Sequence, residues 1–135
     1  VPLLLTSANA LAWGLYTHVY YAQILLWAVP LADRRFRLAA VRFPRLVMAG
    51  ACLPDLSLVT PGRSGFALRT SHQWPNVGCL LQNATDDMSR ALALGNISHL
   101  LSDVIAHNHF VPAHESVWCN SQVVTHAVCV WVFYV

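Results

Sequence analysis

Apolar residues recur at helical spacing along most of the chain, and proline divides the segments in which they do so. Pro44 is one such division, because proline disfavours a helical conformation at the residue before it. Pro112 is another, and it is expected to end a long helix that Thr85 caps at its start. The helices that this pattern predicts cover residues 13–32, 33–43, 46–53, 86–110 and 113–129.

The stretch 60–78 is predicted to be a loop, because proline and glycine, including Pro75 and Gly78, interrupt it repeatedly. The last residues of the chain are β-branched and aromatic, so helix and strand both stay open there. The sequence contains no internal repeat and no glycine-rich phosphate-binding loop.

Composition narrows the class of protein. A length of 135 residues fits one domain, and 56% hydrophobic with 10% charged residues excludes a disordered chain. The formal net charge of +2, without a basic run, lacks the electrostatic footprint of a nucleic-acid-binding protein. The four cysteines form no C-x-x-C pair, so a cysteine zinc site is not expected, and free thiols are preferred over disulfides. The seven histidines outnumber the six acidic residues.

Both ends of the sequence are uncharged, since every arginine and acidic residue lies between Asp33 and Glu115. Residues 1–12 resemble the end of a secretory signal, with a small-x-small site at 10–12, and a buried helix start is the alternative. The domain proper is then expected to be 13–135. The apolar C-terminal end indicates a piece of a longer protein, and a complete small protein with apolar ends is the alternative.

The first predicted helix is long enough to cross a bilayer, because about 20 apolar residues suffice for a span. Thr17, His18 and Gln23 interrupt it with polar side chains. Such groups are costly in lipid, so they argue against a transmembrane segment.

The most informative segment is His99-Leu-Leu-Ser-Asp103-Val-Ile-Ala-His107, inside the longest predicted helix. Positions i, i+4 and i+8 share one face of a helix, so the three polar side chains line about 12 Å of it. Imidazole and carboxylate are zinc ligands, and 12 Å is too long for a single ion. One histidine alone would be a hydrogen-bonded core side chain. A buried carboxylate needs a partner, so the three together predict a metal site in which Asp103 sits centrally and the two histidines serve different ions.

In three places, and in the same order, the sequence resembles the bacterial zinc-dependent phospholipases C, whose fold is shared with certain single-strand-specific zinc nucleases. The matching motifs are Ala12–His18 (AWGLYTH), Gly50–Asp55 (GACLPD) and Ser98–Asp103 (SHLLSD) leading to His107. The resemblance covers most of the chain. It implies an all-α fold, a compact helical domain built around a cluster of up to three zinc ions.

The resemblance also implies which residues hold the first two ions. Trp13 would become the mature N-terminus after cleavage behind residue 12, and would bind one ion through its amine and carbonyl together with His18. Asp55, His72 and His99 would hold a second ion.

Three more ligands follow from the resemblance. Asp103 would bridge two ions, and His107 would hold the third ion with a later histidine, for which His126 is chosen. The family places a glutamate one helical turn after that histidine, where this chain has Val130. Glu115 does not have the spacing to replace it, so the third ion lacks its expected carboxylate.

The function implied is zinc-dependent hydrolysis of a phospholipid phosphodiester at a membrane surface, with Asp55 orienting or deprotonating the attacking water. The expected localisation is outside the cell or in the cell envelope, and association with a membrane is the alternative. One alternative keeps the fold and cleaves single-stranded nucleic acid, against which the lack of a basic groove counts. Another is a non-catalytic membrane or structural helical protein, which the uncharged ends favour.

Overall fold

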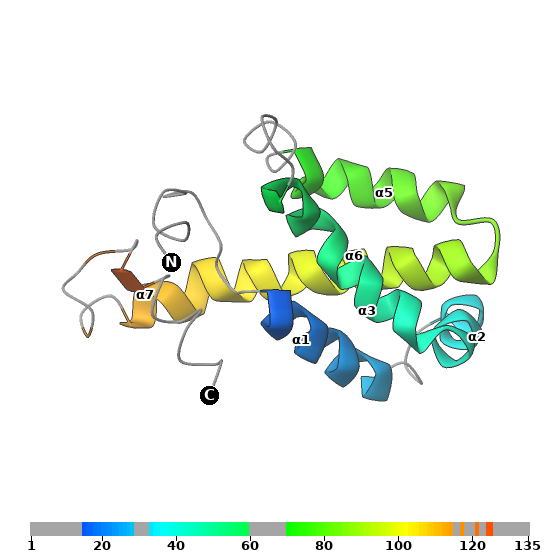
Figure 1. The fold of residues 1–135 in the computed structure, drawn as a ribbon, viewed down its shortest axis with the longest axis horizontal. Coiled ribbons are helices and arrows are strands. Elements are labelled where there is room, and N and C mark those ends of the chain that lie inside the picture. The colour runs from blue at the N-terminus through cyan, green and yellow to red at the C-terminus, as the bar shows by residue number, and fades with distance from the viewer. Residues whose placement is uncertain are drawn as a thin grey trace. The chain divides into compact units, whose positions relative to one another are not determined.

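The computed structural model describes residues 15–28, 33–59, 70–114, 117, 121 and 124–125, and Figure 1 shows their arrangement. The described residues contain helices and no strand, which confirms the expected all-α fold. The expected signal segment 1–12, Trp13 and His126 lie outside them. The chain divides into two units, one formed by His18–Ser102 and the other by the residues on both sides of it. In chain order the elements are α1 (Leu15–Ala28), α2 (Arg34–Arg42), α3 (Pro44–Cys52), η2 (Leu53–Val59), α5 (Trp74–Asn83), α6 (Asp87–Ile105), η3 (Ala106–Phe110) and α7 (Val111–His114).

Helices α2 and α3 confirm the predicted break at Pro44. Asp33 caps α2, since its carboxylate accepts a hydrogen bond of 2.9 Å from the backbone N–H of Arg35. Helix α2 ends at Arg42, and α3 begins at Pro44. Proline suits the first position of a helix because the N–H that it lacks would have no intrahelical partner there.

Helix α3 tightens into the 3₁₀-helix η2, which carries Pro54 and Asp55 in its first turn. Both residues are buried, and Asp55 is 6% exposed. The predicted short helix over 46–53 therefore exists, and the helical path continues beyond it through Asp55.

Helix α5 was not predicted, and the loop expected over 60–78 is wrong for its last residues. The helix begins at Trp74, with Pro75 in its first turn. Proline in the first turn favours the start of a helix. Pro75, which suggested a loop, therefore marks the beginning of α5. Gly78 sits inside α5 with open space around its Cα.

The long helix α6 confirms the strongest helix prediction, with a different cap. Asp86 rather than Thr85 provides it, because the Asp86 carboxylate accepts a 2.7 Å hydrogen bond from the backbone N–H of Ser89. The Ser89 hydroxyl in turn accepts a 3.2 Å hydrogen bond from the Asp86 N–H, which completes a reciprocal cap.

The end of the predicted helix differs from expectation. Regular α-helix stops at Ile105, and the π-helical turn η3 follows. Pro112 does not end the helical path, because it lies in the first turn of α7, where proline is tolerated. Most of the helix expected over 113–129 falls outside the described residues.

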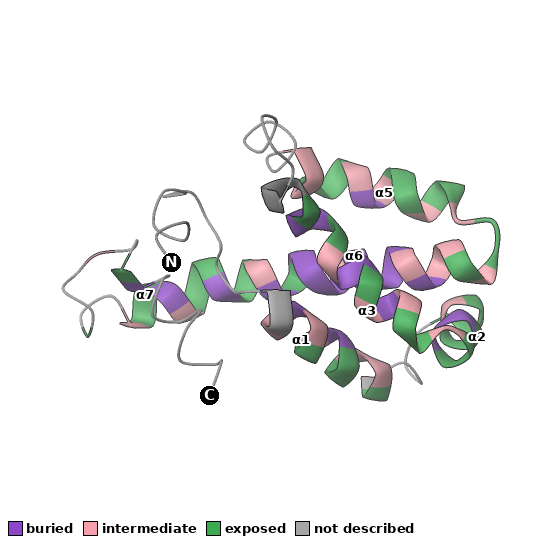
Figure 2. Ribbon diagram, viewed as in Figure 1, coloured by how far each residue is buried: buried purple, intermediate pink, exposed green. Residues whose placement is uncertain are grey.

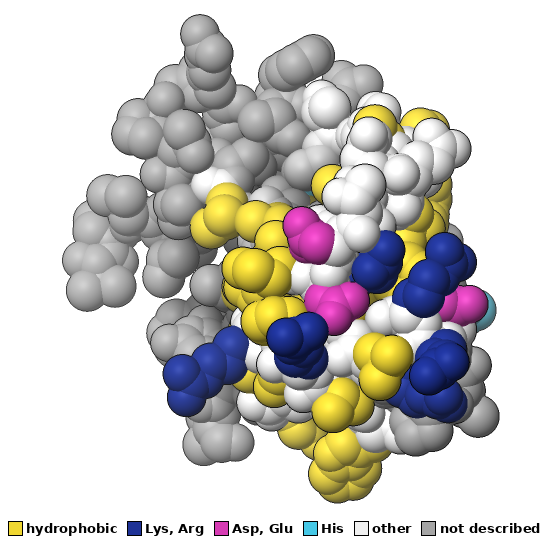
Figure 3. All heavy atoms as spheres, turned by 90° about the vertical axis from the view of Figure 1, so that its right-hand side faces the viewer, with side chains coloured by type: hydrophobic (Ala, Val, Ile, Leu, Met, Phe, Trp, Pro, Cys, Tyr) yellow, Lys and Arg dark blue, Asp and Glu magenta, His cyan; other side chains and the backbone are white. Residues whose placement is uncertain are grey.

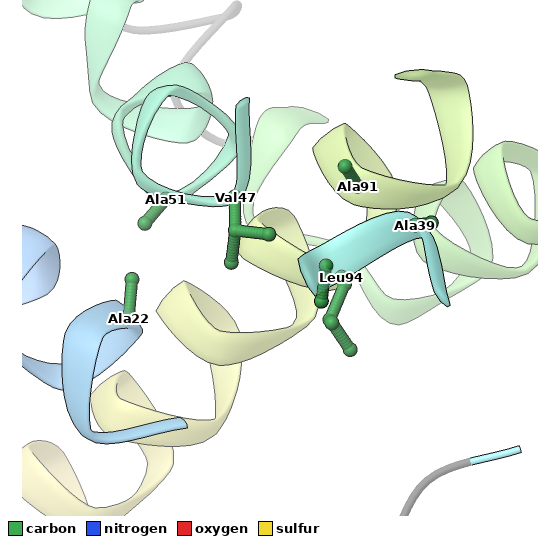
Figure 4. Packing of buried hydrophobic residues seen from close by; sticks show 7 residues of the cluster. Ala22, Ala39, Val47, Ala51, Ala91 and Leu94 are labelled. Atoms are coloured by element: carbon green, nitrogen blue, oxygen red, sulfur yellow. The ribbon is translucent and has the colours of Figure 1, made fainter. Parts of the chain in front are cut away.

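The core of the His18–Ser102 unit consists of small side chains on α1, α2, α3 and α6 (Figure 4). Its buried residues are Ala22, Ala39, Ala40, Val47, Ala51, Ala91 and Leu94. Figure 2 shows buried positions along the middle of α6, which this core surrounds. Small side chains let helix axes approach closely, and α3 and α6 approach one another in this way.

Two glycines make this approach possible. A Cβ added to Gly95 would overlap the carbonyl oxygen of Val47 and lie 2.7 Å from the nitrogen of Ala51. A Cβ added to Gly50 would overlap the carbonyl oxygen of Leu92. The backbones of α3 and α6 are therefore in direct contact, four residues before His99 and five before Asp55.

No helix in the described parts of the chain has both the length and the apolarity needed to cross a membrane. Helix α1, which covers most of the segment in question, has 14 residues.

Candidate metal centre

Asp55, His72 and His99 come together from three separate segments within the His18–Ser102 unit. Asp55 lies in η2, His72 lies in the turn before α5, and His99 lies near the middle of α6. Each offers one ligand atom, and these atoms lie within 4.8 Å of one another. The Nε2 atoms of His72 and His99 are 3.1 Å apart. Oδ1 of Asp55 is 3.4 Å from Nε2 of His72 and 3.8 Å from Nε2 of His99.

The orientation of the His99 ring is fixed by a hydrogen bond at Nδ1, the ring nitrogen that faces away from the cluster. Its Nδ1 lies 2.7 Å from the carbonyl oxygen of Ala51, which can only accept, so Nδ1–H donates. In the neutral ring this leaves a lone pair on Nε2, directed at the cluster. The Ala51 carbonyl belongs to α3 next to Gly50, so the close helix contact also orients this imidazole.

His72 is oriented in the same way through a serine. Its Nδ1 lies 3.1 Å from the Ser71 hydroxyl, which itself donates a 2.8 Å hydrogen bond to the carbonyl oxygen of Pro54. The hydroxyl therefore accepts from Nδ1–H, and Nε2 of His72 carries the lone pair. Two Nε2 lone pairs then face each other across 3.1 Å. Such an arrangement repels unless a proton or a metal cation lies between them.

The Asp55 carboxylate provides an independent sign of a cation-binding site. It is 6% exposed, and its Oδ2 is buried without a hydrogen-bond partner among the described residues. A buried carboxylate without compensation is costly, whereas coordination supplies the compensating charge. Two nitrogens and one oxygen are a donor set that zinc accepts. Ligand atoms about 2.1 Å from a tetrahedral zinc are about 3.4 Å from one another. The observed separations of 3.1, 3.4 and 3.8 Å fit this geometry.

His18 faces the second oxygen of the same carboxylate. Its Nε2 lies 4.0 Å from Oδ2 of Asp55, and its ring stacks on His99 with 3.6 Å between centroids. Nδ1 of His18 lies 2.9 Å from the Ser102 hydroxyl, which donates a 2.7 Å hydrogen bond to the carbonyl oxygen of His99. Nδ1–H of His18 therefore donates, and its Nε2 points toward the carboxylate with a lone pair. In all three imidazoles, therefore, Nδ1–H donates a hydrogen bond and Nε2 carries the lone pair.

Asp103 and His107 belong to the other unit of the chain. Asp103 is half-buried in α6, one turn after His99, as the helical spacing requires. His107 is exposed in η3. The expected stripe assumed a regular α-helix as far as His107. The π-helical turn begins at Ala106, so His107 lies just beyond the regular α-helix. Their roles as ligands stay predictions, as do those of Trp13 and His126.

Sequence reasoning missed the residues that orient the imidazoles. Ser71 precedes His72 directly, and Ser102 follows His99 by three residues, which is the spacing for a hydroxyl bond back to the helix carbonyl. A hydroxyl engaged in this way can accept from a histidine. That local signal was available for Ser102, whereas the link from Ser71 to Pro54 depends on the tertiary fold.

Cys52 lies close to the metal centre, but its thiol is not favoured in the thiolate form that binds metals. Burial, and after it the nearby Asp55 carboxylate, raises the pKa of the Cys52 thiol. Its Sγ donates to the carbonyl oxygen of Met48 at 3.4 Å. The two cysteines that the structure describes, Cys52 and Cys79, are free, as preferred from the sequence.

Comparison with known proteins adds one finding. The model of a protein family described as zinc-dependent phospholipase C matches residues 17–134, a range that includes every expected ligand except Trp13. Neither the curated proteins nor the solved structures contain a significant match.

Proposed function

Since this chain belongs to the zinc-dependent phospholipase C family, we propose that it hydrolyses the phosphodiester bond of phospholipids, with zinc held by Asp55, His72 and His99. The reaction adds water across the bond between phosphorus and the glycerol oxygen, and it yields diacylglycerol and a phosphorylated headgroup. The observation that carries the proposal is the cluster of two Nε2 atoms and one carboxylate oxygen within 4.8 Å, in which Asp55 and His99 are buried and His72 is half-buried.

Zinc bound at these atoms would supply a Lewis acid and a water of lowered pKa. Three protein ligands leave one tetrahedral position for water or substrate, which is the arrangement of catalytic rather than structural zinc sites. The hydrogen bonds to Ala51 and Ser71 keep both imidazoles in the tautomer that presents Nε2. These residues hold the ligand set before substrate arrives.

Asp55 has two roles in this proposal. Oδ1 belongs to the ligand cluster, and Oδ2 is buried without a hydrogen-bond partner among the described residues. Oδ2 is therefore placed to orient the attacking water and to accept its proton. His18 lies beside this oxygen, with its Nε2 atom 4.0 Å from Oδ2.

The proposal extends to the further ligands and to the setting. Asp103 would bridge two ions, Trp13 and His18 would hold one ion, and His107 with His126 would hold a third. The substrate is met at a membrane surface, and the protein acts outside the cell or in the cell envelope. No further candidate function is favoured by the described residues.

The experiment uses the full chain loaded with zinc. Bound zinc is measured by mass spectrometry, and diacylglycerol release is measured from phosphatidylcholine. Asp55→Asn is expected to lower zinc affinity and to reduce hydrolysis by at least about 100-fold, because it removes both a ligand and the proton acceptor. Asp86→Asn is the matched control, because Asn also caps helices and Asp86 is exposed. It should behave like the wild type.

Two further measurements complete the test. A zinc chelator should abolish hydrolysis, and added zinc should restore it. A single-stranded oligonucleotide serves as the competing substrate. Wild-type hydrolysis rates in Asp55→Asn would contradict the proposed centre, and faster cleavage of the oligonucleotide than of the lipid would contradict the proposed substrate.

A further inference from the structure

Helix α1 carries an exposed apolar stripe. The side chains of Tyr20, Ile24 and Trp27 are 60%, 43% and 87% exposed. They follow one another at positions i, i+4 and i+7, so they lie on one face of the helix. Single exposed apolar side chains are ordinary, whereas a row of them that ends in an almost fully exposed tryptophan marks an interaction surface.

Helix α2 combines exposed apolar side chains with arginines. Leu38 and Val41 are 52% and 72% exposed, and Arg34 and Arg37 are exposed within one helical turn of them. Segment 33–45 contains five of the eight arginines of the chain and one acidic residue. Figure 3, which faces the α2 end of the molecule, shows arginine and hydrophobic side chains mixed over one surface.

Among the described residues, Asp33 and Asp87 form ion pairs with this segment without neutralising it. Asp33 lies 3.1 Å from Nε of Arg35, and Asp87 lies 3.3 Å from Nη1 of Arg42. Both arginine side chains are 71% exposed, and exposed pairs of this kind contribute little. Five arginines against these two carboxylates leave a formal charge of +3. The surface is therefore complementary to an anionic partner that also accepts apolar side chains.

We propose that this surface docks the protein on an anionic phospholipid bilayer. The inference rests on the proposed function, because a phospholipid hydrolase meets its substrate at a membrane. Tryptophan and tyrosine partition into the interface of a bilayer, and arginine is attracted by anionic headgroups. Apolar and basic side chains together are the pattern of interfacial helices. The docking surface comprises Tyr20, Ile24, Trp27, Leu38, Val41 and the arginines of segment 33–45.

The docking surface is separate from the metal centre. Trp27 lies nine residues after His18 on α1, which corresponds to about 13 Å along the helix. Docking would therefore raise the concentration of enzyme at the lipid surface without changing the ligand cluster. Binding to vesicles and hydrolysis can be measured independently for that reason.

The test measures partition of the full chain onto vesicles by sedimentation. Vesicles of phosphatidylcholine with about one third phosphatidylglycerol are compared with vesicles of phosphatidylcholine alone. The wild type should bind the anionic vesicles more tightly, and raised salt should weaken that binding. Trp27→Ala should weaken it about tenfold or more, because a large apolar side chain no longer enters the lipid. Arg34→Gln with Arg37→Gln should weaken it about 25-fold, at about fivefold for each charge.

Trp74→Ala is the matched control. Trp74 is 46% exposed on α5, which lies on the other side of α3 and α6 from α1 in Figure 1. Its loss should leave vesicle binding unchanged. Wild-type binding by both docking variants, or an equal loss in Trp74→Ala, would overturn the proposal. A dimer in ultracentrifugation that Trp27→Ala abolishes would assign the surface to a second copy of the chain instead. Vesicle binding without diacylglycerol release would support docking while refuting the proposed reaction.

Discussion

The close contact between α3 and α6 predicts that a single added methyl group, in Gly95→Ala, destabilises the protein. In Gly95→Ala the new Cβ would lie 2.7 Å from the nitrogen of Ala51 and would overlap the carbonyl oxygen of Val47. Ordinary contacts of a Cβ begin at 3.4 Å, so the two helices must separate by at least about 0.7 Å. The opposing atoms are backbone, so no side-chain rotation can relieve the overlap.

Two opposing effects set the size of the change. Alanine favours a helix over glycine by about 0.5–1 kcal/mol, which stabilises the variant. Overpacking costs about 1–3 kcal/mol, and a contact between backbones belongs at the upper end of that range. The free energy of unfolding of Gly95→Ala should therefore fall by about 2 kcal/mol. The separation also lengthens the 2.7 Å bond from His99 to Ala51, so zinc affinity should fall about tenfold.

Gly78 supplies the matched control, because it is also inside a helix and an added Cβ there meets nothing within 4 Å. Gly78→Ala should raise the free energy of unfolding by about 0.5–1 kcal/mol, through helix propensity alone. Urea unfolding followed by circular dichroism gives both values, and calorimetry gives the zinc affinity. If Gly95→Ala were as stable as Gly78→Ala, the reasoning about the helix contact would be refuted.

Two further predictions concern hydrogen bonds. Ser71→Ala removes the acceptor that orients His72, so zinc affinity measured by competition with a chelating dye should fall by about 10- to 100-fold; an unchanged affinity would contradict the orienting role. Asp86 has its pKa lowered from 3.8, first by the backbone hydrogen bond from Ser89 and then by the Ser89 side chain. Its stabilising effect is therefore complete above its unfolded pKa and lost as the pH falls through the lower folded pKa. Urea midpoints below pH 3.8 should fall less steeply with acid in Asp86→Asn than in the wild type, and equal slopes would contradict this assignment.

Local signals were sufficient for several helix boundaries. Pro44 has a fixed local role as a helix breaker, and the structure uses it as predicted. Asp33 caps α2, a role that was not predicted although aspartate is a common capping residue. Pro75 failed as a signal because proline marks both loops and helix starts, and only the residues after it decide which. Thr85 and Asp86 are both capping residues, so their order along the chain could not distinguish them.

The candidate site depended on information that spacing along the chain does not contain. One helix places His99 and Asp103 a turn apart, and that much follows from the sequence. The contact of α3 with α6 at two glycines brings the segment that leads to Asp55 close to His99, and the hydrogen bond from Ser71 to Pro54 holds His72 beside Asp55. The sequence pattern alone does not show which segments lie against these glycines. The resemblance to a family supplied this grouping, and the hydrogen bonds explain how the fold maintains it.

The contact between α3 and α6 also bears on which ions the centre can admit. Asp55 and His99 are attached to two backbones that already touch, so the ligand atoms cannot approach further by moving the helices together. They also cannot move apart without losing the 2.7 Å bond between His99 and Ala51. An ion such as calcium needs six to eight oxygen ligands at about 2.3–2.6 Å, and it would require a wider cluster with more carboxylates. If the centre holds a metal ion, the closeness of two helices would therefore favour a small cation such as zinc over calcium.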